Sequence, residues 1–504
     1  MKNEPASKAI RVHPENPRIF EFRGKPRVLL CATEHYGAVM NRPFDFRAYL
    51  ADAAQKKQTL TRLFTLFREL QGPVNPYSTC KPESPDYIAP FARTGPGQAL
   101  DGQPKFNLEQ WNPEFFERLH GFLSLASAYG IIVEVVLLSN TYADSIWALN
   151  PLNAKNNVNG LKEIHWPEYL SRRHAEVFGW QCAHVRKLVA ETNRYDHVFY
   201  EICNEPGGGV PAEWVASLAR SPQAGLAMPT PGEVNEWQSA IAAVIRQAES
   251  EMPNQHLIAG QAATDWRSAE QPCDQSFHSL PLDIVNVHPL PGTLLGGKCF
   301  DLGKFMAKEL KLRALRDFCL QSYAWPRPLN YDEDNSSTQY KDVDAWTIHR
   351  KRAWTTLLSG GHYDMIDFSI TIHTPAGTPE SRRCLRTWMK HLSEFIHSVD
   401  LVHARPLPGF LKHQPPHTLA SVFAVEGEDY CIYLADDREL AETGVGEPIT
   451  GAISFDLPDG LFRTSCYSPA TGLYSPSTTL AGKDGAQIGL PEFRHDLVVR
   501  VRRD

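Results

Sequence analysis

The chain has 504 residues, of which 42% are hydrophobic, 22% charged and 10% aromatic. This is ordinary globular composition, and it excludes disordered, collagen-like and coiled-coil proteins. Lys and Arg number 51 against 58 Asp and Glu, for a formal net charge of −7. Because no basic field is available to hold a polyanion, nucleic acid is not expected as a partner. The length favours one large domain followed by a small one.

The first residues, MKNEPASKAIRVHPENPRIF, contain no apolar stretch of the length that a signal peptide needs. No window of the sequence is long and apolar enough to span a bilayer, so a cytoplasmic protein without a membrane partner is expected. The 10 cysteines form no CxxC pair and are expected to be reduced, buried thiols. The sequence leaves open whether the protein forms a homo-oligomer.

Short apolar runs alternate with longer amphipathic stretches through most of the chain, which predicts parallel strands joined by helices. Strands are expected over residues 28–32, 60–67, 131–138, 198–202, 257–260, 284–287, 328–331 and 363–368. Helices are expected over residues 112–130, 169–192, 234–250, 304–320, 343–358 and 383–397. No GxGxxG or Walker loop follows the first strand, so the pattern favours a (β/α)8 TIM barrel over a doubly wound sheet.

The character of the sequence changes after about residue 405. Segments such as SVFAVEG, DYCIYLADD, AISFDL and HDLVVRVRR alternate apolar and polar residues between turn signals. They predict a small all-β sandwich domain over residues 405–504, after a barrel over residues 1–404. No linker separates the two, so the sandwich is expected to pack firmly against the barrel.

In such a barrel the catalytic residues are expected at the carboxyl-terminal ends of the strands. The fourth strand ends in HVFYEICNEPGGG, with Glu205 just beyond its last apolar position. Strand alternation predicts that Glu201 and Glu205 share one face and that Asn204 points the other way. The seventh strand ends in PLNYDED, which places Glu333 at the same rim. Across one barrel mouth, Glu205 and Glu333 would form the pair of carboxylates that glycoside hydrolysis requires.

The segments YEICNEP and PLNYDED resemble the two signatures of the retaining clan A glycoside hydrolases, a superfamily of (β/α)8 enzymes that includes cellulases, mannanases and β-galactosidases. The resemblance covers the whole barrel. It implies that Asn204 contacts the sugar 2-hydroxyl, that Glu205 is the acid/base and that Glu333 is the nucleophile. It also implies that Arg62, in LTRLF, holds the nucleophile ionised, and that His288, in VNVHP, lines the site. The tail resembles the small sandwich that follows the barrel in several clan members.

Two features depart from the clan. A tryptophan commonly ends the eighth strand, whereas this strand reads YDMIDFSIT, so the residue that floors the first sugar subsite is not identified. Asp332 and Asp334 also flank Glu333, and the sequence leaves open which of these three acidic residues is the nucleophile.

Other polar or aromatic residues near strand ends are candidates for sugar binding. They are Glu34 and His35 after the first strand, Asn140 after the third, Trp147 in the loop over residues 141–166, and Gln261 after the fifth. A second long loop, rich in Pro and Gly, is expected over residues 71–111. Two such walls favour a pocket over an open cleft.

The sequence therefore predicts a retaining glycoside hydrolase that cleaves a glycoside or oligosaccharide, expected to be β-linked, by double displacement with two glutamates and without cofactor or metal. One alternative is a divalent-metal-dependent TIM-barrel sugar isomerase that uses Glu205, His288 and Glu333 as ligands. Another is a non-catalytic carbohydrate-binding protein. Metal analysis would identify the first, and binding without turnover of any aryl glycoside would favour the second.

Overall fold

The computed structural model describes residues 9–31, 37–66, 85–141, 144–206, 227–263, 280–287, 311–334, 343–365, 379–438 and 443–504. Eight parallel strands form one sheet in the order β4-β13-β12-β11-β10-β9-β8-β5. Their bounds are β4 (Leu30–Cys31), β5 (Leu60–Phe64), β8 (Ile132–Ser139), β9 (Val198–Asn204), β10 (Ile258–Gly260), β11 (Ile284–Val287), β12 (Leu329–Tyr331) and β13 (His362–Asp364). The edges of the sheet meet where Thr59 N donates to Leu30 O at 3.1 Å. The predicted eight-stranded barrel is confirmed, and each strand overlaps its predicted range.

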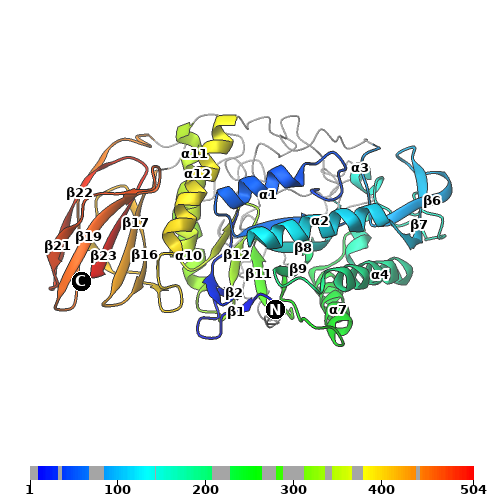
Figure 1. Cartoon of the computed structure of the whole chain (residues 1–504), viewed down its shortest axis with the longest axis horizontal. Helices are drawn as coiled ribbons and strands as arrows, with labels where there is room; N and C mark the ends of the chain where they lie inside the picture. Colours follow the sequence, from blue (N-terminus) through cyan, green and yellow to red (C-terminus); the bar gives the residue numbers. More distant parts are fainter. Residues whose placement is uncertain are drawn as a thin grey trace, which may run out of the picture.

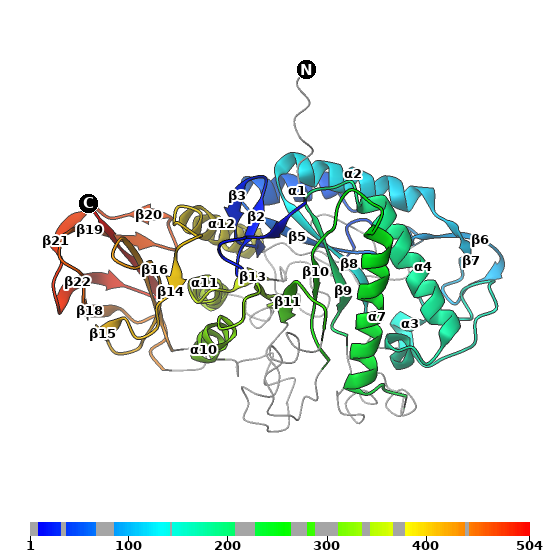
Figure 2. The same cartoon turned by 90° about the horizontal axis from the view of Figure 1, so that it is seen from below.

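Helices surround this barrel (Figures 1 and 2). The longer ones are α1 (Phe46–Gln55), α2 (Pro113–Tyr129), α4 (Ala175–Thr192), α7 (Pro231–Glu249), α10 (Leu312–Ser322), α11 (Val343–Leu358) and α12 (Pro379–Ile396). The signals predicted for α2 hold, since Asn112 caps it and Gly130 ends it with φ of 71°. Helix α4 begins later than predicted, because Trp166–Leu170 forms a separate 3-10 turn. Helix α1, capped by Asp45, was not predicted.

The segment expected to be a loop before α2 contains an antiparallel hairpin, which corrects that expectation. Its strands are β6 (Phe91–Gln98) and β7 (Pro104–Trp111). The hairpin extends away from the barrel (Figure 1). Asn159 Oδ1 accepts from Leu108 N at 2.8 Å, so the long loop after β8 is attached to the hairpin. Pro and Gly in the sequence of β6, FARTGPGQ, concealed the strand.

An apolar cluster fills the end of the barrel where the strands begin. It contains Leu60, Ile132, Phe199 and Ile284, which are the first or second residues of four strands. The amino-terminal strands β1 (Arg11–Val12), β2 (Phe20–Phe22) and β3 (Lys25–Arg27) form a small sheet of their own, and Phe20 belongs to the same cluster. This cluster, called the apolar layer below, closes the barrel away from the strand ends that carry the candidate site.

The carboxyl-terminal region consists of antiparallel strands in two main sheets. The larger sheet contains β14 (Arg405–Pro406), β16 (Thr418–Val425), β17 (Asp429–Asp436), β23 (Asp496–Arg503), β19 (Leu461–Ser468), β20 (Leu473–Tyr474) and β21 (Thr478–Ala481), and the smaller one contains β15 (Leu411–His413), β18 (Ile449–Phe455) and β22 (Ala486–Phe493). One hydrophobic cluster includes residues of both sheets, such as Ile432 and Phe455. This confirms the predicted all-β sandwich.

The sandwich packs firmly on the barrel, as the lack of a linker predicted. Helices α10, α11 and α12 lie between the barrel strands and the sandwich (Figure 1). One buried hydrophobic cluster joins Trp354 of α11 and Phe395 of α12 to Tyr433 and Val498 of the sandwich. No helix in the described part of the chain is long and apolar enough to cross a membrane.

Candidate active site

The guanidinium of Arg62 lies at the centre of the barrel, fully buried. Its Nη1 donates to Glu333 Oε1 at 2.6 Å, and its Nη2 donates to Asn204 Oδ1 at 3.1 Å. Nη2 also pairs with Glu201, and Nε lies 3.3 Å from Asp332 Oδ2. A single side chain of β5 therefore contacts residues at the ends of β9 and β12, neither of which is a neighbour of β5 in the sheet.

Further polar side chains complete this level of the barrel. Glu134 of β8 stands opposite Arg62 in the strand register, with its carboxylate 3.7 Å from Arg62 Nε. Asn286 of β11 donates from Nδ2 to Glu134 Oε1 at 2.6 Å and to Asp332 Oδ2 at 3.2 Å. Arg62, Glu134, Glu201, Asn286, Asp332 and Glu333 are called the charged layer below.

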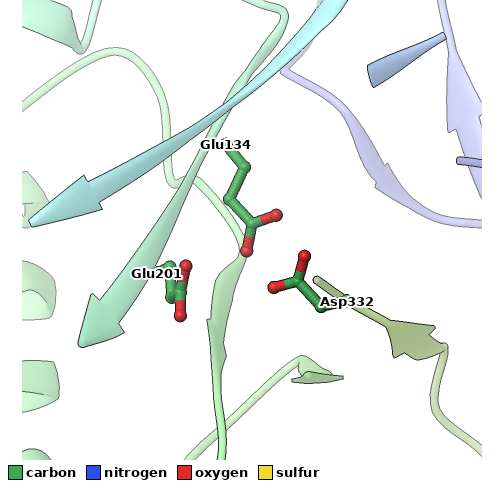
Figure 3. A group of neighbouring side chains, drawn as sticks. All are labelled: Glu134, Glu201 and Asp332. Atoms are coloured by element: carbon green, nitrogen blue, oxygen red, sulfur yellow. The ribbon is translucent and has the colours of Figure 1, made fainter. Parts of the chain in front are cut away.

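Three carboxylates of the charged layer are close enough together to resemble a metal site. Figure 3 shows the carboxylates of Glu134 of β8 and Glu201 of β9 close to that of Asp332, which follows β12. One oxygen of each carboxylate is within ion-pair distance of the guanidinium of Arg62. Because Arg62 already supplies the positive charge at this point, the residues fit an arginine-centred ion-pair network better than a metal ion.

The charged layer holds more acidic groups than Arg62 can balance, and this affects their protonation. Burial, reinforced by the charges of Asp332 and Glu201, raises the pKa of Glu134 well above its ordinary value. Burial and the charge of Asp332 likewise raise the pKa of Asp364, at the end of β13. The structure therefore favours protons on these two carboxyls, which reduces the negative charge beneath the rim.

The two predicted catalytic glutamates share an unusual backbone conformation. Glu205 has φ of 45° and Glu333 has φ of 53°, the left-handed region that non-glycine residues rarely adopt. Each follows the end of a barrel strand, β9 or β12. Residues held in such conformations cluster at functional sites, because the surrounding structure must stabilise them. Around Glu333, Asp332 N donates to Val287 O and Asp334 N donates to Asp364 O, both at 2.9 Å.

The prediction that Asn204 points away from Glu201 is wrong. Both side chains contact Nη2 of Arg62, so both lie on the inner side of the barrel. The regular alternation of an extended strand therefore does not extend to Asn204, the last residue of β9. The result brings the end of β9 toward Glu333.

The two aspartates beside Glu333 have partners within the protein. Asp332 is fully buried between Arg62 and Asn286. Asp334 accepts from Arg352 Nε and from the Tyr363 hydroxyl, both at 2.6 Å. Burial disfavours the ionised form of Asp334, but the charges of Arg352 and His349 outweigh it and lower the pKa of this carboxyl. The Glu333 side chain is 5% exposed, against 0% for Asp332 and 1% for Asp334.

The remaining predicted residues either follow a barrel strand, pack inside the protein or lie outside the described part of the chain. Asn140 follows β8 and lines a small cavity, and its backbone N donates to Asn204 O at 3.0 Å. Gln261 follows β10, where its carbonyl accepts from Gln238. Trp147, in the short helix α3 (Asp144–Trp147), is buried against Tyr169, so the structure shows it as a packing residue and its contact with a sugar stays a prediction. Glu34, His35 and His288 lie outside the described residues.

Sequence reasoning missed Glu134, Asn286 and Asp364 as members of the site. Each is a polar residue inside a buried strand, in IVEVVLLS, IVNV and HYD. A polar residue within an otherwise apolar barrel strand was the available signal.

The model of a family described as Cellulase (glycosyl hydrolase family 5) matches residues 91–289. The matched segment contains β9 with Glu201, Asn204 and Glu205, whereas Arg62 and Glu333 lie outside it. The match confirms the resemblance to clan A glycoside hydrolases. The match covers less than half of the chain, and together with the fold it supports the assignment of the chain as a glycosidase.

Solved structures share the fold over nearly the whole chain. A glycoside hydrolase family 5 protein from Bacteroides vulgatus ATCC 8482 is 11% identical, with a TM-score of 0.60, and the match covers 98% of this chain and 94% of that one. A protein described as a glycoside hydrolase is 12% identical, with a TM-score of 0.57 and coverage of 99% and 97%. No curated protein matches the sequence. At these identities the structural likeness shows the fold alone.

Proposed function

We propose that the protein is a retaining glycosidase in which Glu333 is the nucleophile and Glu205 is the acid/base. The observation that carries this proposal is the position of Arg62, which donates to Glu333 Oε1 at 2.6 Å and to Asn204 Oδ1 at 3.1 Å. One guanidinium thus relates the end of β12 to the residue that precedes Glu205. This supports two glutamates acting on one sugar at the barrel mouth.

The proposed roles follow from the surroundings of each carboxyl. The ion pair with Arg62 favours the ionised form of Glu333, as attack on the anomeric carbon requires. Glu205 is partly exposed at the end of β9, where it can protonate the departing oxygen and later activate water. Asn204 precedes Glu205, and its side chain is held in place by a hydrogen bond from Arg62. It is therefore placed to form a hydrogen bond with a sugar hydroxyl. Glycosyl-enzyme formation would neutralise Glu333, which favours the change of Glu205 from acid to base.

The environment of the neighbouring acids favours Glu333 among the three candidates for nucleophile. Asp332 is enclosed by Arg62 and Asn286, and Asp334 is held by Arg352 and Tyr363. All three carboxylates have a guanidinium partner, and that of Glu333 is the most exposed of them.

The test separates the two glutamates by the steps that they serve. Glu205→Ala should slow substrates with poor leaving groups by several orders of magnitude, while a dinitrophenyl glycoside still forms the glycosyl-enzyme. Azide should then give a glycosyl azide with the configuration of the substrate. Glu333→Ala should inactivate the enzyme even toward the activated substrate, and azide in the vacated space should give the inverted product.

Asp332→Ala and Asp334→Ala complete this test. The same azide stereochemistry in both glutamate variants would contradict the assignment. So would an active Glu333→Ala enzyme beside an inactive aspartate variant. A panel of nitrophenyl glycosides identifies the sugar beforehand, and activity lost on chelation and restored by a divalent ion would favour the isomerase alternative.

A further inference from the structure

The left-handed backbone at Glu333 is held by a network behind it. Asp334 N donates to Asp364 O at 2.9 Å, and the Asp334 carboxylate accepts from Tyr363 OH and from Arg352 Nε. Arg352 Nη2 also donates to the hydroxyl of Tyr331, the last residue of β12, at 2.8 Å. Arg352 therefore contacts residues on both sides of Glu333 in the sequence.

Arg352 belongs to α11, the helix that also binds the sandwich. Arg350 forms a two-point ion pair with Asp496 of β23, at 2.8 and 2.7 Å, and both side chains are almost fully buried. Trp354 stacks on Tyr433 of β17, with ring centroids 5.5 Å apart. Residues 350 and 354 share one face of a helix and residue 352 faces the other way. One face of α11 is thus attached to the sandwich and the other to the rim of the barrel.

We propose that the carboxyl-terminal sandwich positions the nucleophile through α11, with Arg350 and Asp496 as positioning residues. The path runs from Asp496 to Arg350, along the rigid helix to Arg352, and from Arg352 to Asp334, next to Glu333. The catalytic half of this inference rests on the proposed role of Glu333. The buried ion pairs Arg350–Asp496 and Arg352–Asp334 both require a fixed position of α11. Weakening the first pair should therefore change the geometry of the second.

The test compares two aspartates on the same pair of sandwich strands. Asp496→Asn weakens the pair with Arg350. Asp429→Asn is the matched control, because Asp429 of β17 accepts from Arg500 of β23 at 2.7 and 3.1 Å without contacting α11. On an aryl glycoside that the enzyme hydrolyses, Asp496→Asn should lower kcat about tenfold or more and leave KM within about twofold. Asp429→Asn should leave both constants within about twofold.

A second measurement does not depend on catalysis. Hydrogen–deuterium exchange of the peptide that contains residues 329–334 should become about tenfold faster in Asp496→Asn and stay unchanged in Asp429→Asn. If Asp496→Asn does not fold, Arg350→Lys keeps the charge but loses the two-point geometry, and the same two effects are expected from it.

The outcomes separate the two proposals. Unchanged exchange in the Asp496 or Arg350 variant, or a fall in kcat that Asp429→Asn reproduces, would overturn the positioning role. Faster exchange without loss of kcat would overturn its catalytic part. An active Glu333→Ala enzyme would instead refute the assignment of the nucleophile, whatever the exchange data show.

Discussion

The two layers inside the barrel are built from opposite kinds of side chain. At the end where the strands begin, Leu60, Ile132, Phe199 and Ile284 form the apolar layer. Two residues further along β5 and β8, the inward positions carry Arg62 and Glu134 of the charged layer. Both layers are buried to a similar extent, yet they contribute differently to the protein.

Burying apolar surface stabilises a fold. Burying an ion pair adds little net stability, because the cost of removing the charges from water offsets their attraction. The apolar layer can therefore account for closure of the barrel. The charged layer instead fixes the positions of Glu201, Asn204 and Glu333 around one guanidinium. The comparison indicates that stability and chemistry are placed at different depths of one barrel.

The largest effect is expected from Arg62→Met. This variant leaves the carboxylates of Glu201, Asp332 and Glu333 without the cation that they share, so the free energy of unfolding should fall by about 3 to 5 kcal/mol. Activity should fall by several orders of magnitude. Denaturant titration and kcat/KM measure both effects. As a control, Arg23→Met removes a partly exposed pair with Asp196 and should cost about 1 kcal/mol or less. A fully active Arg62→Met enzyme would show that the charged layer is not the site.

Phe199→Ala tests the other layer. The cavity left by this fully buried ring should lower the free energy of unfolding by about 3 to 5 kcal/mol. The folded fraction should keep its kcat, since no residue of the apolar layer contacts substrate in the proposed mechanism. Tyr129→Ala, at a ring 44% exposed on α2, should change stability by about 0.5 kcal/mol or less. A selective loss of kcat in Phe199→Ala would remove the distinction between the layers.

Glu134→Gln tests the charged layer by pH. The pKa of Glu134 is raised in the folded state, so its contribution to stability is full below the ordinary value of 4.5 and is lost as pH rises through the raised value. Gln cannot ionise, so the variant should gain stability relative to the wild type as pH rises above 4.5. Denaturant titrations across this range measure the gain.

The control variant, Glu114→Gln, should change its stability relative to the wild type in the opposite direction as pH rises. Hydrogen bonding to Arg42 lowers the pKa of Glu114, so the stability that Glu114 contributes is present at neutral pH and is lost as pH falls. Glu114→Gln should therefore lose stability relative to the wild type as pH rises through the acidic range. Parallel pH curves for the two variants would contradict the burial argument for Glu134.

The smallest effect is expected from Ile132→Val in the apolar layer. Removing one methylene should cost about 0.5 to 1.5 kcal/mol. Because the change involves no titrating group, the loss should be the same at every pH where the protein is folded. A pH-dependent loss would show that the two layers are coupled.

Local patterns were sufficient for the elements and for the residues at the rim. Apolar runs such as IIVEVVLLS, the Asn112 cap and the Gly130 stop depend on a few neighbouring residues, and they predicted β8 and α2. The segments CNEP and DED predicted Glu205 and Glu333 because both follow apolar strands. The hairpin β6–β7 was missed because its cross-strand partners, rather than an uninterrupted pattern, define it.

Only the tertiary structure decided how these residues meet. The sequence by itself determined eight strands, their helices and a sandwich, since the length and periodicity of apolar runs are local properties. Strand register and the break in alternation at Asn204 placed Arg62 among Glu134, Glu201, Asp332 and Glu333. Helix α11 brought the sandwich behind the nucleophile. Several of these contacts join residues far apart in the sequence, such as Arg62 and Glu333 or Arg350 and Asp496, and they follow from closing the barrel and docking the sandwich, not from any single segment.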